Sequence, residues 1–293
     1  MAPTLFFDYI VTGLELGLIY ALMSTGLNLI YGVMRLANFA HGEYYMVGGY
    51  AFYFSTSLLG ISPIFGVPFA ILAGFLIGFA VERLVIRDTY TKVLARPLEY
   101  AMLGTMLVSV ILQNLAIEIA GPSVYSTPPF FAGDLKVLQV GISFNRVVTM
   151  VVSVATLGFL YYFIKTTRTG REWRAVAQNR AGAIVSGINV GRVSLYAYGV
   201  GAAMAALSGA LLTPVYGVWP NIGFSTVLTL SFVIIVLGGL GSIEGAFIGA
   251  LIIGLTHSFV GGYIGPEFAD VAMYLVLLTV LVLKPTGLFG EPA

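Results

Sequence analysis

Residues 165–192 read KTTRTGREWRAVAQNRAGAIVSGINVGR, and this stretch interrupts a chain that is almost entirely apolar on both sides. It holds six of the fourteen lysine and arginine residues of the protein. A basic, helix-forming segment between apolar stretches has to lie in water, where a soluble partner can reach it. The segment therefore decides which ends of the neighbouring helices face the cytoplasm.

The composition places the rest of the chain in a membrane. Of 293 residues, 58% are hydrophobic and 9% are charged, and the mean hydropathy is +0.96. A soluble domain carries about 25% charged residues, so this chain has too little charge to cover a surface that faces water. We expect an all-α, polytopic helix bundle that forms a single transmembrane domain over 1–293.

Three further properties exclude other classes of protein. The net charge of +1 gives no indication of nucleic-acid binding. The absence of cysteine excludes disulfides and thiolate sites. No lysine or arginine precedes Arg35, so we interpret the first apolar stretch as a mature span and not as a signal peptide.

Apolar stretches of sufficient length predict eight or nine spans. A helix needs about 20 apolar residues to cross the hydrocarbon core. The count stays open because glycines interrupt the stretch 226–263, which forms either two spans or a re-entrant pair. The expected spans are 9–31, 43–59, 64–82, 98–119, 147–164, 194–214, 226–240, 245–263 and 268–283.

The basic residues predict the orientation of these spans. One short loop contains Arg83, Arg87, Lys92 and Arg96, and two spans separate it from 165–192. Because lysine and arginine stay in the cytoplasm, we expect nine spans with the N-terminus outside and the C-terminus inside. Twelve of the fourteen basic residues then lie on one side. The loop 121–145 becomes extracytoplasmic.

Two local features are expected around that loop and between the helices. Pro128 and Pro129 exclude a helix in 121–145, and 135–140 can form a short hairpin. Small residues recur every four positions on several spans, which lets membrane helices approach closely. These ridges serve either packing inside the bundle or a seam with a second subunit. They are Gly201–Ala205–Gly209, Ala202–Ala206–Ala210, Gly241–Gly245–Gly249, Gly13–Gly17 and Gly74–Gly78.

Polar residues between the first two spans form the first candidate for a translocation path. The stretch reads NFAHGE and contains Asn38, His41, Gly42 and Glu43 at an expected membrane edge. One interpretation is a broken helix whose polar groups face the path. The other is a tight turn in which Glu43 caps a helix and Arg35 or His41 neutralises it. One His and one Glu make no ligand set, so no metal site is predicted.

Two further stretches are candidates for the same path. Residues 238–245 read GGLGSIEG and offer Gly239, Gly241, Ser242 and Glu244. They form either the second interrupted segment of an internal repeat or a tight cytoplasmic turn. Gln113 and Asn114 lie in mid-span and either bond a neighbouring helix or line the path. Trp219, Pro220 and Asn221 are expected to line an outer mouth. His257 is expected to be a satisfied packing residue and not a relay.

Helix signals inside 165–192 predict a short surface helix followed by a break. Alanine, glutamine and Glu172 favour the helix, and Gly187 can end it. Trp173, Val176, Ile184 and Val185 are expected to be apolar knobs among basic residues. An amphipathic helix on anionic lipid would look similar, but the bulk apolar surface is small. A protein partner is therefore the preferred interpretation.

Motifs along the whole chain resemble one family. They are GLNLIYGVMR at 26–35, NFAHGE at 38–43, GR at 170–171 with RAVAQN at 174–179, GINV at 187–190, LGGLGS at 237–242 and KPTGLFG at 284–290. In this order they resemble the H-type permease subunit of branched-chain amino-acid ABC importers. Permeases for urea or short amides share the Asn-x-Ala-His-Gly-Glu pattern, so that motif does not fix the substrate.

The resemblance implies an assembly in the bacterial cytoplasmic (inner) membrane. The expected partners, besides membrane lipid, are a second permease of M type, two cytoplasmic ATPases that hold ATP and magnesium, and an extracytoplasmic solute-binding protein. The region 173–189 is implied to contact the ATPase. Its candidate coupling residues are Trp173, Arg174, Ala175, Val176, Ala177, Gln178, Asn179, Arg180, Gly187, Ile188 and Asn189.

The chain lacks the means to power transport by itself. A phosphate-binding P-loop needs a lysine directly after a glycine, and Lys92, Lys136, Lys165 and Lys284 all follow other residues. We therefore predict a non-enzymatic subunit without a cofactor of its own. An ion-coupled secondary transporter, using His41, Glu43, Glu118 or Glu244, is the alternative from another class. Branched-chain or other neutral amino acids are the first expected substrates, and urea or amides the second.

Overall fold

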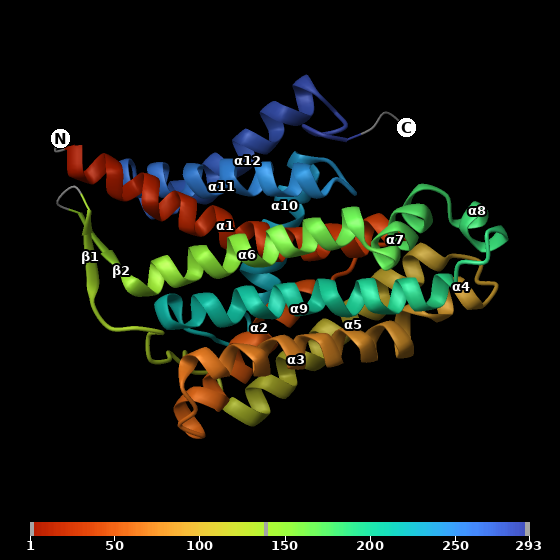
Figure 1. Ribbon diagram of the computed structural model, residues 1–293, viewed down its shortest axis with the longest axis horizontal. Helices are drawn as coiled ribbons and strands as arrows, with labels where there is room; N and C mark the ends of the chain where they lie inside the picture. Colours follow the sequence, from red (N-terminus) through yellow and green to blue (C-terminus); the bar gives the residue numbers. More distant parts are fainter. Residues whose placement is uncertain (1–2, 138–139, 291–293) are drawn as a thin grey trace.

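Long helices run side by side along the longest axis of the protein (Figure 1). The structure is a computed structural model that describes residues 3–137 and 140–290. Within these residues, seven helices are long and apolar enough to cross a membrane. They are α1 (Pro3–Met34), α3 (Pro63–Val81, continued by η2, Glu82–Ile86), α5 (Pro97–Ala120), α6 (Phe144–Thr166), α9 (Val190–Tyr216), α11 (Ile243–Tyr263) and α12 (Pro266–Leu283). All seven were predicted as spans.

The other two predicted spans are shorter, interrupted helices. The stretch 43–59 forms α2 (His41–Tyr53) and a π-helical turn, η1 (Phe54–Leu58). The stretch 226–240 forms a π-helical segment, η3 (Gly223–Leu228), that continues as α10 (Thr229–Gly238). Neither is among the seven apolar spans found in the described residues, so the prediction of eight or nine spans is not confirmed.

Helix α9 lies at the centre of the bundle and packs against α1, α2 and α3. A Cβ added to Gly26 of α1 would lie 2.4 Å from the carbonyl oxygen of Gly201, and one added to Gly48 of α2 would lie 2.1 Å from that of Ala206. A Cβ on Gly254 would lie 2.4 Å from the Cα of Gly17. These ridges therefore serve packing within the chain, as one of the two interpretations predicted.

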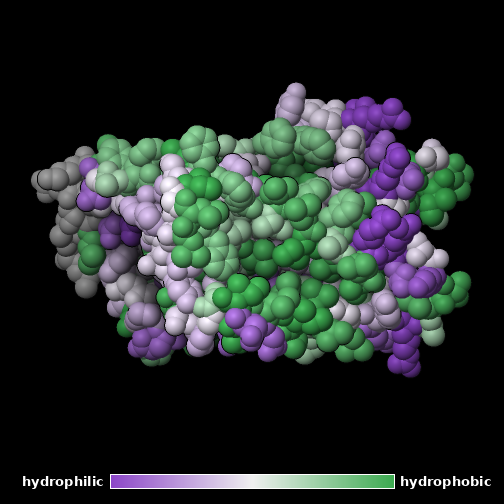
Figure 2. Space-filling view, turned by 90° about the horizontal axis from the view of Figure 1, so that it is seen from below, coloured by the Kyte–Doolittle hydropathy of each residue, from purple (hydrophilic) through white to green (hydrophobic). Residues whose placement is uncertain are grey.

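The two ends of the bundle differ in charge. One end carries the loops 83–96 and 165–192, with α4 (Asp88–Thr91), α7 (Arg168–Gln178) and α8 (Arg180–Val185), and we call it the basic end (Figure 1). Arg35 also lies there, because its Nη2 donates to the carbonyl oxygen of Ala177 at 3.4 Å. Figure 2 shows hydrophobic residues across the middle of one face and hydrophilic residues gathered most densely at the basic end.

The opposite end carries the N-terminus and the predicted hairpin, and we call it the hairpin end (Figure 1). Strands β1 (Asp134–Val137) and β2 (Val140–Ser143) pair antiparallel, with Asp134 opposite Ser143. The segment around Pro128 and Pro129 is not helical, as expected. Arg146 at this end pairs with Asp8 at 3.3 Å and with Glu15 at 3.2 Å.

Candidate functional site

The stretch NFAHGE enters the interior of the bundle instead of staying at its edge. The Nε2 of His41 lies 2.8 Å from the carbonyl oxygen of Met23. Met23 precedes the end of α1 by three turns, which is about 16 Å of helix. Residues 35–40 therefore cross the basic half of the bundle without a helix, and α2 begins near its middle. The prediction of a position at the membrane edge is wrong.

A second half-helix starts at the same depth. A Cβ added to Gly42 would lie 2.0 Å from the carbonyl oxygen of Gly223, so the first turns of α2 and η3 touch. From this contact α2 runs toward the hairpin end, where the ring of Phe52 packs 5.4 Å from that of Phe130. Helix α10 runs the other way and ends at Gly238, near the basic end. We call the contact of Gly42 with Gly223 the mid-bundle junction.

Glu43 places a carboxylate at the mid-bundle junction. It is 0% exposed, and its Oε1 accepts hydrogen bonds from Ser109 Oγ at 2.9 Å and Gln113 Nε2 at 2.8 Å. Its Oε2 has no hydrogen-bond partner among the described residues and lies toward Gly223. Helix N-termini carry partial positive charge. Because two of them meet here, their partial charges offset part of the cost of burying a carboxylate at the junction.

The alternative in which Glu43 is a cap does not describe this site. Ala40 is the N-cap of α2, and no side chain caps that helix. Arg35 bonds α7 and His41 bonds α1, so neither is the partner of Glu43. Asn38 instead orders the break, because its Oδ1 accepts from the backbone of Ala40 at 3.0 Å.

A polar stripe on α5 completes the site, and the sequence analysis found only part of it. Thr105 Oγ1 accepts from the backbone nitrogen of Phe39 at 3.1 Å, while Ser109 and Gln113 bind Glu43. These three residues recur every four positions and so share one helix face, which is a signal that could have found them. Asn114 lies off the stripe and bonds Val110 of its own helix at 2.8 Å.

The stretch GGLGSIEG forms a tight turn at the basic end, away from Glu43. Asn28 clamps it, because its Oδ1 accepts from the backbone of Gly241 at 2.7 Å and its Nδ2 donates to the carbonyl oxygen of Ser242 at 2.5 Å. Gly239 and Gly241 have φ of 108° and 88°, which favours glycine. Glu244 pairs with Lys165 at 3.2 Å. Of the two interpretations of this stretch, the tight turn is the correct one. The break in the helices that faces α2 lies earlier in the chain, at 217–222, between α9 and η3.

Two cavities lie on opposite sides of the mid-bundle junction. A pocket of about 310 Å³ in the half toward the hairpin end is lined by Trp219, as expected, and reaches Met23 and Tyr45 beside the junction. A cleft of about 720 Å³ opens at the basic end. Its lining includes Arg35, Gln178, Leu240, Gly241, Ser242, Glu244 and Phe289.

The pocket toward the hairpin end also contains a hydrogen-bonded chain that was not predicted from the sequence. Tyr20 Oη lies 3.1 Å from His257 Nδ1, and His257 Nε2 lies 3.1 Å from Asp270 Oδ1. His257 was expected to be a satisfied packing residue, and both of its ring nitrogens do have polar partners. These residues come from α1, α11 and α12, so no spacing along the sequence could have grouped them. Within residues 3–137 and 140–290, no three His, Asp or Glu side chains are grouped as a metal site needs.

Two capped helices form the projection at the basic end. Thr167 caps α7 by accepting from Gly170 N at 3.0 Å, and Asn179 caps α8 by accepting from Gly182 N at 2.8 Å. Gly187, with a φ of 79°, ends α8 as predicted. Its N–H donates to Ile184 at 3.0 Å, and the next N–H, that of Ile188, donates to the carbonyl oxygen of Ala183 at 3.0 Å.

The apolar residues of this projection divide into a surface pair and a buried pair. Ile184 and Val185 are 59% and 89% exposed, as expected of knobs that meet a partner. Trp173 and Val176 are 3% and 2% exposed, so the prediction that they are surface knobs is wrong. The ring of Trp173 packs 5.5 Å from that of Phe163 and fastens α7 to α6. Arg174 also bonds the carbonyl oxygen of Ile164.

Known proteins resemble this chain over nearly its full length. The family model for the permease component of the branched-chain amino acid transport system matches residues 9–281. The high-affinity branched-chain amino acid transport permease LivH of Escherichia coli K12 is 34% identical over 302 residues, covering 98% of this chain and 96% of that protein. BraD of Pseudomonas aeruginosa is 32% identical with the same coverage.

More distant proteins extend the comparison. LivM of Escherichia coli K12 is 24% identical over 308 residues, covering 93% of this chain and 68% of that protein. The solved structure of PsaBC from Streptococcus pneumoniae in complex with Fab contains a chain that superposes with a TM-score of 0.52 at 12% identity. It covers 95% of this chain and 92% of that one, which shows the fold alone. The protein belongs to the family of permease components of branched-chain amino acid transport systems.

Proposed function

We propose that the protein is the H-type permease subunit of an ABC importer for branched-chain or other neutral amino acids. Relatives that match nearly the full chain are named for branched-chain amino acids, which favours these substrates over urea or short amides. The same relatives favour an ABC importer over an ion-coupled secondary transporter. The chain resembles both LivH and LivM, which supports a second, M-type permease beside it. Two ATPases with ATP and magnesium and a solute-binding protein complete the assembly.

The orientation follows from the charge of the two ends. The basic end faces the cytoplasm, because lysine and arginine accumulate in cytoplasmic loops. The N-terminus and the β1–β2 hairpin then lie outside, and the C-terminal segment 284–290 lies inside. Seven apolar helices and the family support a multi-pass protein of the inner membrane.

The exposed tip of α8 is the observation that carries the proposal. Ile184 and Val185 project from the basic end, next to Arg180. An apolar pair ringed by charge suits a protein partner, and the chain has no P-loop of its own. Trp173 and Val176 support this surface from below by holding α7 on the bundle. ATPase closure is therefore transmitted through 173–189.

The two cavities define the path that this closure switches. Substrate enters the pocket of about 310 Å³ at the hairpin end and leaves by the cleft of about 720 Å³ at the basic end. The mid-bundle junction separates them, so a change in its packing opens or closes the route. Asn38, His41, Gly42, Glu43 and Gln113 belong to this junction. Gly241, Ser242 and Glu244 line the exit cleft, and Gly239 lies in the same turn.

Cross-linking tests the docking surface directly. The chain contains no cysteine, so a single Val185→Cys variant reacts at one position. We expect disulfide or short bifunctional cross-links from position 185 to the ATPase in the assembled transporter. Val93→Cys is the matched control, because Val93 is fully exposed in the other basic loop. Equal cross-linking at 93 and 185, or none at 185, would show that the ATPase docks elsewhere.

A further inference from the structure

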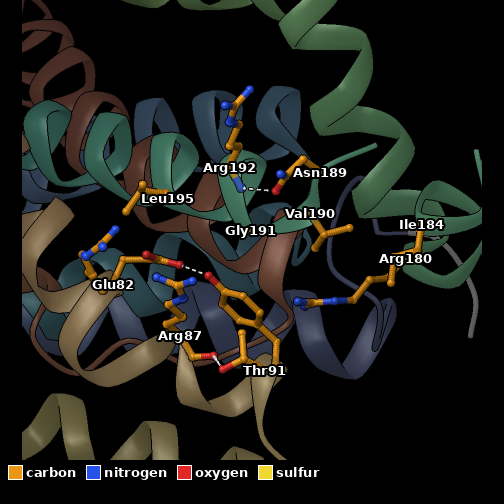
Figure 3. A pocket seen from close by; sticks show the side chains of 12 residues that line it. Glu82, Arg87, Thr91, Arg180, Ile184, Asn189, Val190, Gly191, Arg192 and Leu195 are labelled. Atoms are coloured by element: carbon orange, nitrogen blue, oxygen red, sulfur yellow. Dashed lines mark hydrogen bonds between the residues drawn. The ribbon is translucent and has the colours of Figure 1, made fainter. Parts of the chain in front are cut away.

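A second cleft at the basic end separates α8 and the start of α9 from η2 and α4 (Figure 3). Its volume is about 440 Å³. Arg83 and Arg87 line it from one loop, and Arg180 and Arg192 line it from the other. Figure 3 shows Arg180 extending from α8 into the cleft, on the opposite side from Arg87. The cleft thus joins two segments that lie about one hundred residues apart in the sequence, and we call it the arginine cleft.

The arginine cleft has an excess of positive charge. Within the described residues none of its four arginines forms an ion pair, although other basic residues at this end do. Glu82 is the acidic residue of the lining; it is 1% exposed, and the hydroxyl of Tyr90 donates to it. The guanidinium of Arg180 lies 4.8 Å from the centre of the Tyr90 ring. Four arginines against one glutamate leave three positive charges without a partner.

The cleft lies at the depth of lipid headgroups. Arg83 is in the last turns of the apolar span 63–86, and Arg192 is in the first turn of the span 190–216. These spans pack against each other along α3 and α9. Leu195 lines the cleft, and Leu84 and Tyr196, the sequence neighbours of Arg83 and Leu195, are 77% and 48% exposed, so apolar side chains are available next to the cleft.

We propose that the arginine cleft binds the phosphate group of an anionic phospholipid from the cytoplasmic leaflet. Guanidinium groups bind phosphate through paired, charge-assisted hydrogen bonds, and basic pockets between spans attract anionic headgroups. The exposed leucine and tyrosine accept the acyl chains. An acidic segment of a protein would meet the charge but would not explain the apolar flank at membrane depth.

A bound headgroup has a mechanical consequence. It bridges the loop 83–91 and the segment 180–192, so it fixes α8 relative to the bundle. This consequence rests on the proposed docking of the ATPase at α8, whereas lipid binding itself does not. Lipid binding and transport are therefore tested by separate measurements.

Native mass spectrometry tests the binding without any partner subunit. The purified protein is released from nanodiscs that contain equal amounts of phosphatidylglycerol and phosphatidylethanolamine. We expect the wild-type protein to retain phosphatidylglycerol preferentially. We expect Arg87→Gln with Arg180→Gln to weaken retention about thirtyfold, given the usual gain per basic residue at an anionic surface.

The control variant removes the same amount of positive charge from the same end of the bundle. Arg96→Gln with Arg168→Gln removes two arginines that pair on the surface with Glu99 and Glu172, outside the cleft. The proposal predicts that this variant keeps wild-type retention. No preference for phosphatidylglycerol in the wild-type protein overturns it, and so does an equal loss in the two double variants. The wild-type measurement holds even if the cleft variant fails to fold.

Two additions identify the source of the ligand. Inorganic phosphate is added to the same nanodiscs at about 10 mM, which keeps the ionic strength well below the physiological value of about 0.15 M. If phosphate displaces the lipid completely, the cleft is a site for a soluble anion and the lipid proposal is wrong. If the ATPase instead requires Arg87 and Arg180 while lipid retention is unchanged by their removal, the cleft is a protein dock. Unchanged retention in phosphate supports the proposal.

Discussion

Gly42 and Gly223 determine how closely the two half-helices approach. Their backbones touch where any side chain would collide, and Glu43 fills the remaining polar space with a carboxylate. The sequence shows that Asn38, His41 and Glu43 are unusual for an apolar chain. It does not show that Glu43 bonds α5, because the partner residues lie more than sixty positions away.

Gly42→Ala should disrupt the mid-bundle junction. The new Cβ would lie 2.0 Å from the carbonyl oxygen of Gly223, so the helices must separate. We expect a loss of about 1–3 kcal/mol in the free energy of unfolding and a loss of uptake. Thermal unfolding in detergent and uptake by proteoliposomes measure the two effects.

Gly158→Ala is the matched control for this change. Gly158 lies in α6, is exposed, and has no atom within 4 Å of an added Cβ. Alanine there should raise the unfolding free energy by about 0.5–1 kcal/mol, as expected for a helix interior. If Gly42→Ala behaves like Gly158→Ala, the close contact at the junction is not required.

Asn28→Ala should loosen the turn that begins α11. The substitution removes the acceptor for Gly241 N and the donor to the Ser242 carbonyl oxygen. We expect a loss of about 1–3 kcal/mol in the free energy of unfolding, because Gly241 N loses its acceptor. The Ser242 carbonyl oxygen keeps its bond from Ala246 N at 3.0 Å. Differential scanning fluorimetry of the purified protein measures it. Asn114→Ala is the control, because exposed Asn114 bonds only the Val110 carbonyl oxygen of its own helix, and its loss should change stability little. Equal losses of stability in the two variants would disprove the clamp.

Hydropathy located all nine helical stretches, but it did not show that α2 and α10 are short and interrupted. The seven long helices are bounded by proline, glycine or charged residues that end an apolar run, so their limits are visible in the sequence. Helix α2 contains His41 and Glu43 and is sheltered by its neighbours, and it therefore needs no apolar surface of its own. Its true start depends on contacts with α1, α5 and η3, which a count of apolar residues does not include.

The projection of α7 and α8 was predictable in outline and not in detail. Its basic charge and the glycine at 187 are local signals, and the structure contains the expected helix and break. Which apolar side chains face outward depends on how α7 packs on α6. The burial of Trp173 was not predictable from the segment 165–192 alone, because its packing partner, Phe163, belongs to another helix.

Val185→Asp should uncouple ATP hydrolysis from transport. Val185 is 89% exposed at the tip of α8, so the substitution leaves the fold intact. It puts a charge without a partner into an interface that we propose is apolar. We expect at least a tenfold loss of uptake (about 1.4 kcal/mol) in proteoliposomes, with unchanged thermal stability. Val93→Asp should keep wild-type uptake, and equal loss in both variants would contradict the assignment of the dock.

The bundle as a whole is asymmetric along its long axis. Basic loops, the projection and the cleft of about 720 Å³ share one end, while the hairpin and the pocket of about 310 Å³ share the other. This arrangement was predictable from the positions of lysine and arginine, because charge follows the side of the membrane. The number of spans was not predictable, because α2 and η3 start in the interior of the bundle.

Uptake of labelled leucine by proteoliposomes tests most directly whether this chain is a permease driven by partner ATPases. The complete assembly contains both permeases, the ATPases and the solute-binding protein. It should accumulate leucine when ATP is supplied on the side of the membrane that carries the ATPases. This chain alone, given a proton gradient and no ATP, should accumulate none. Accumulation by the chain alone under a proton gradient would contradict the proposal and identify a secondary transporter instead.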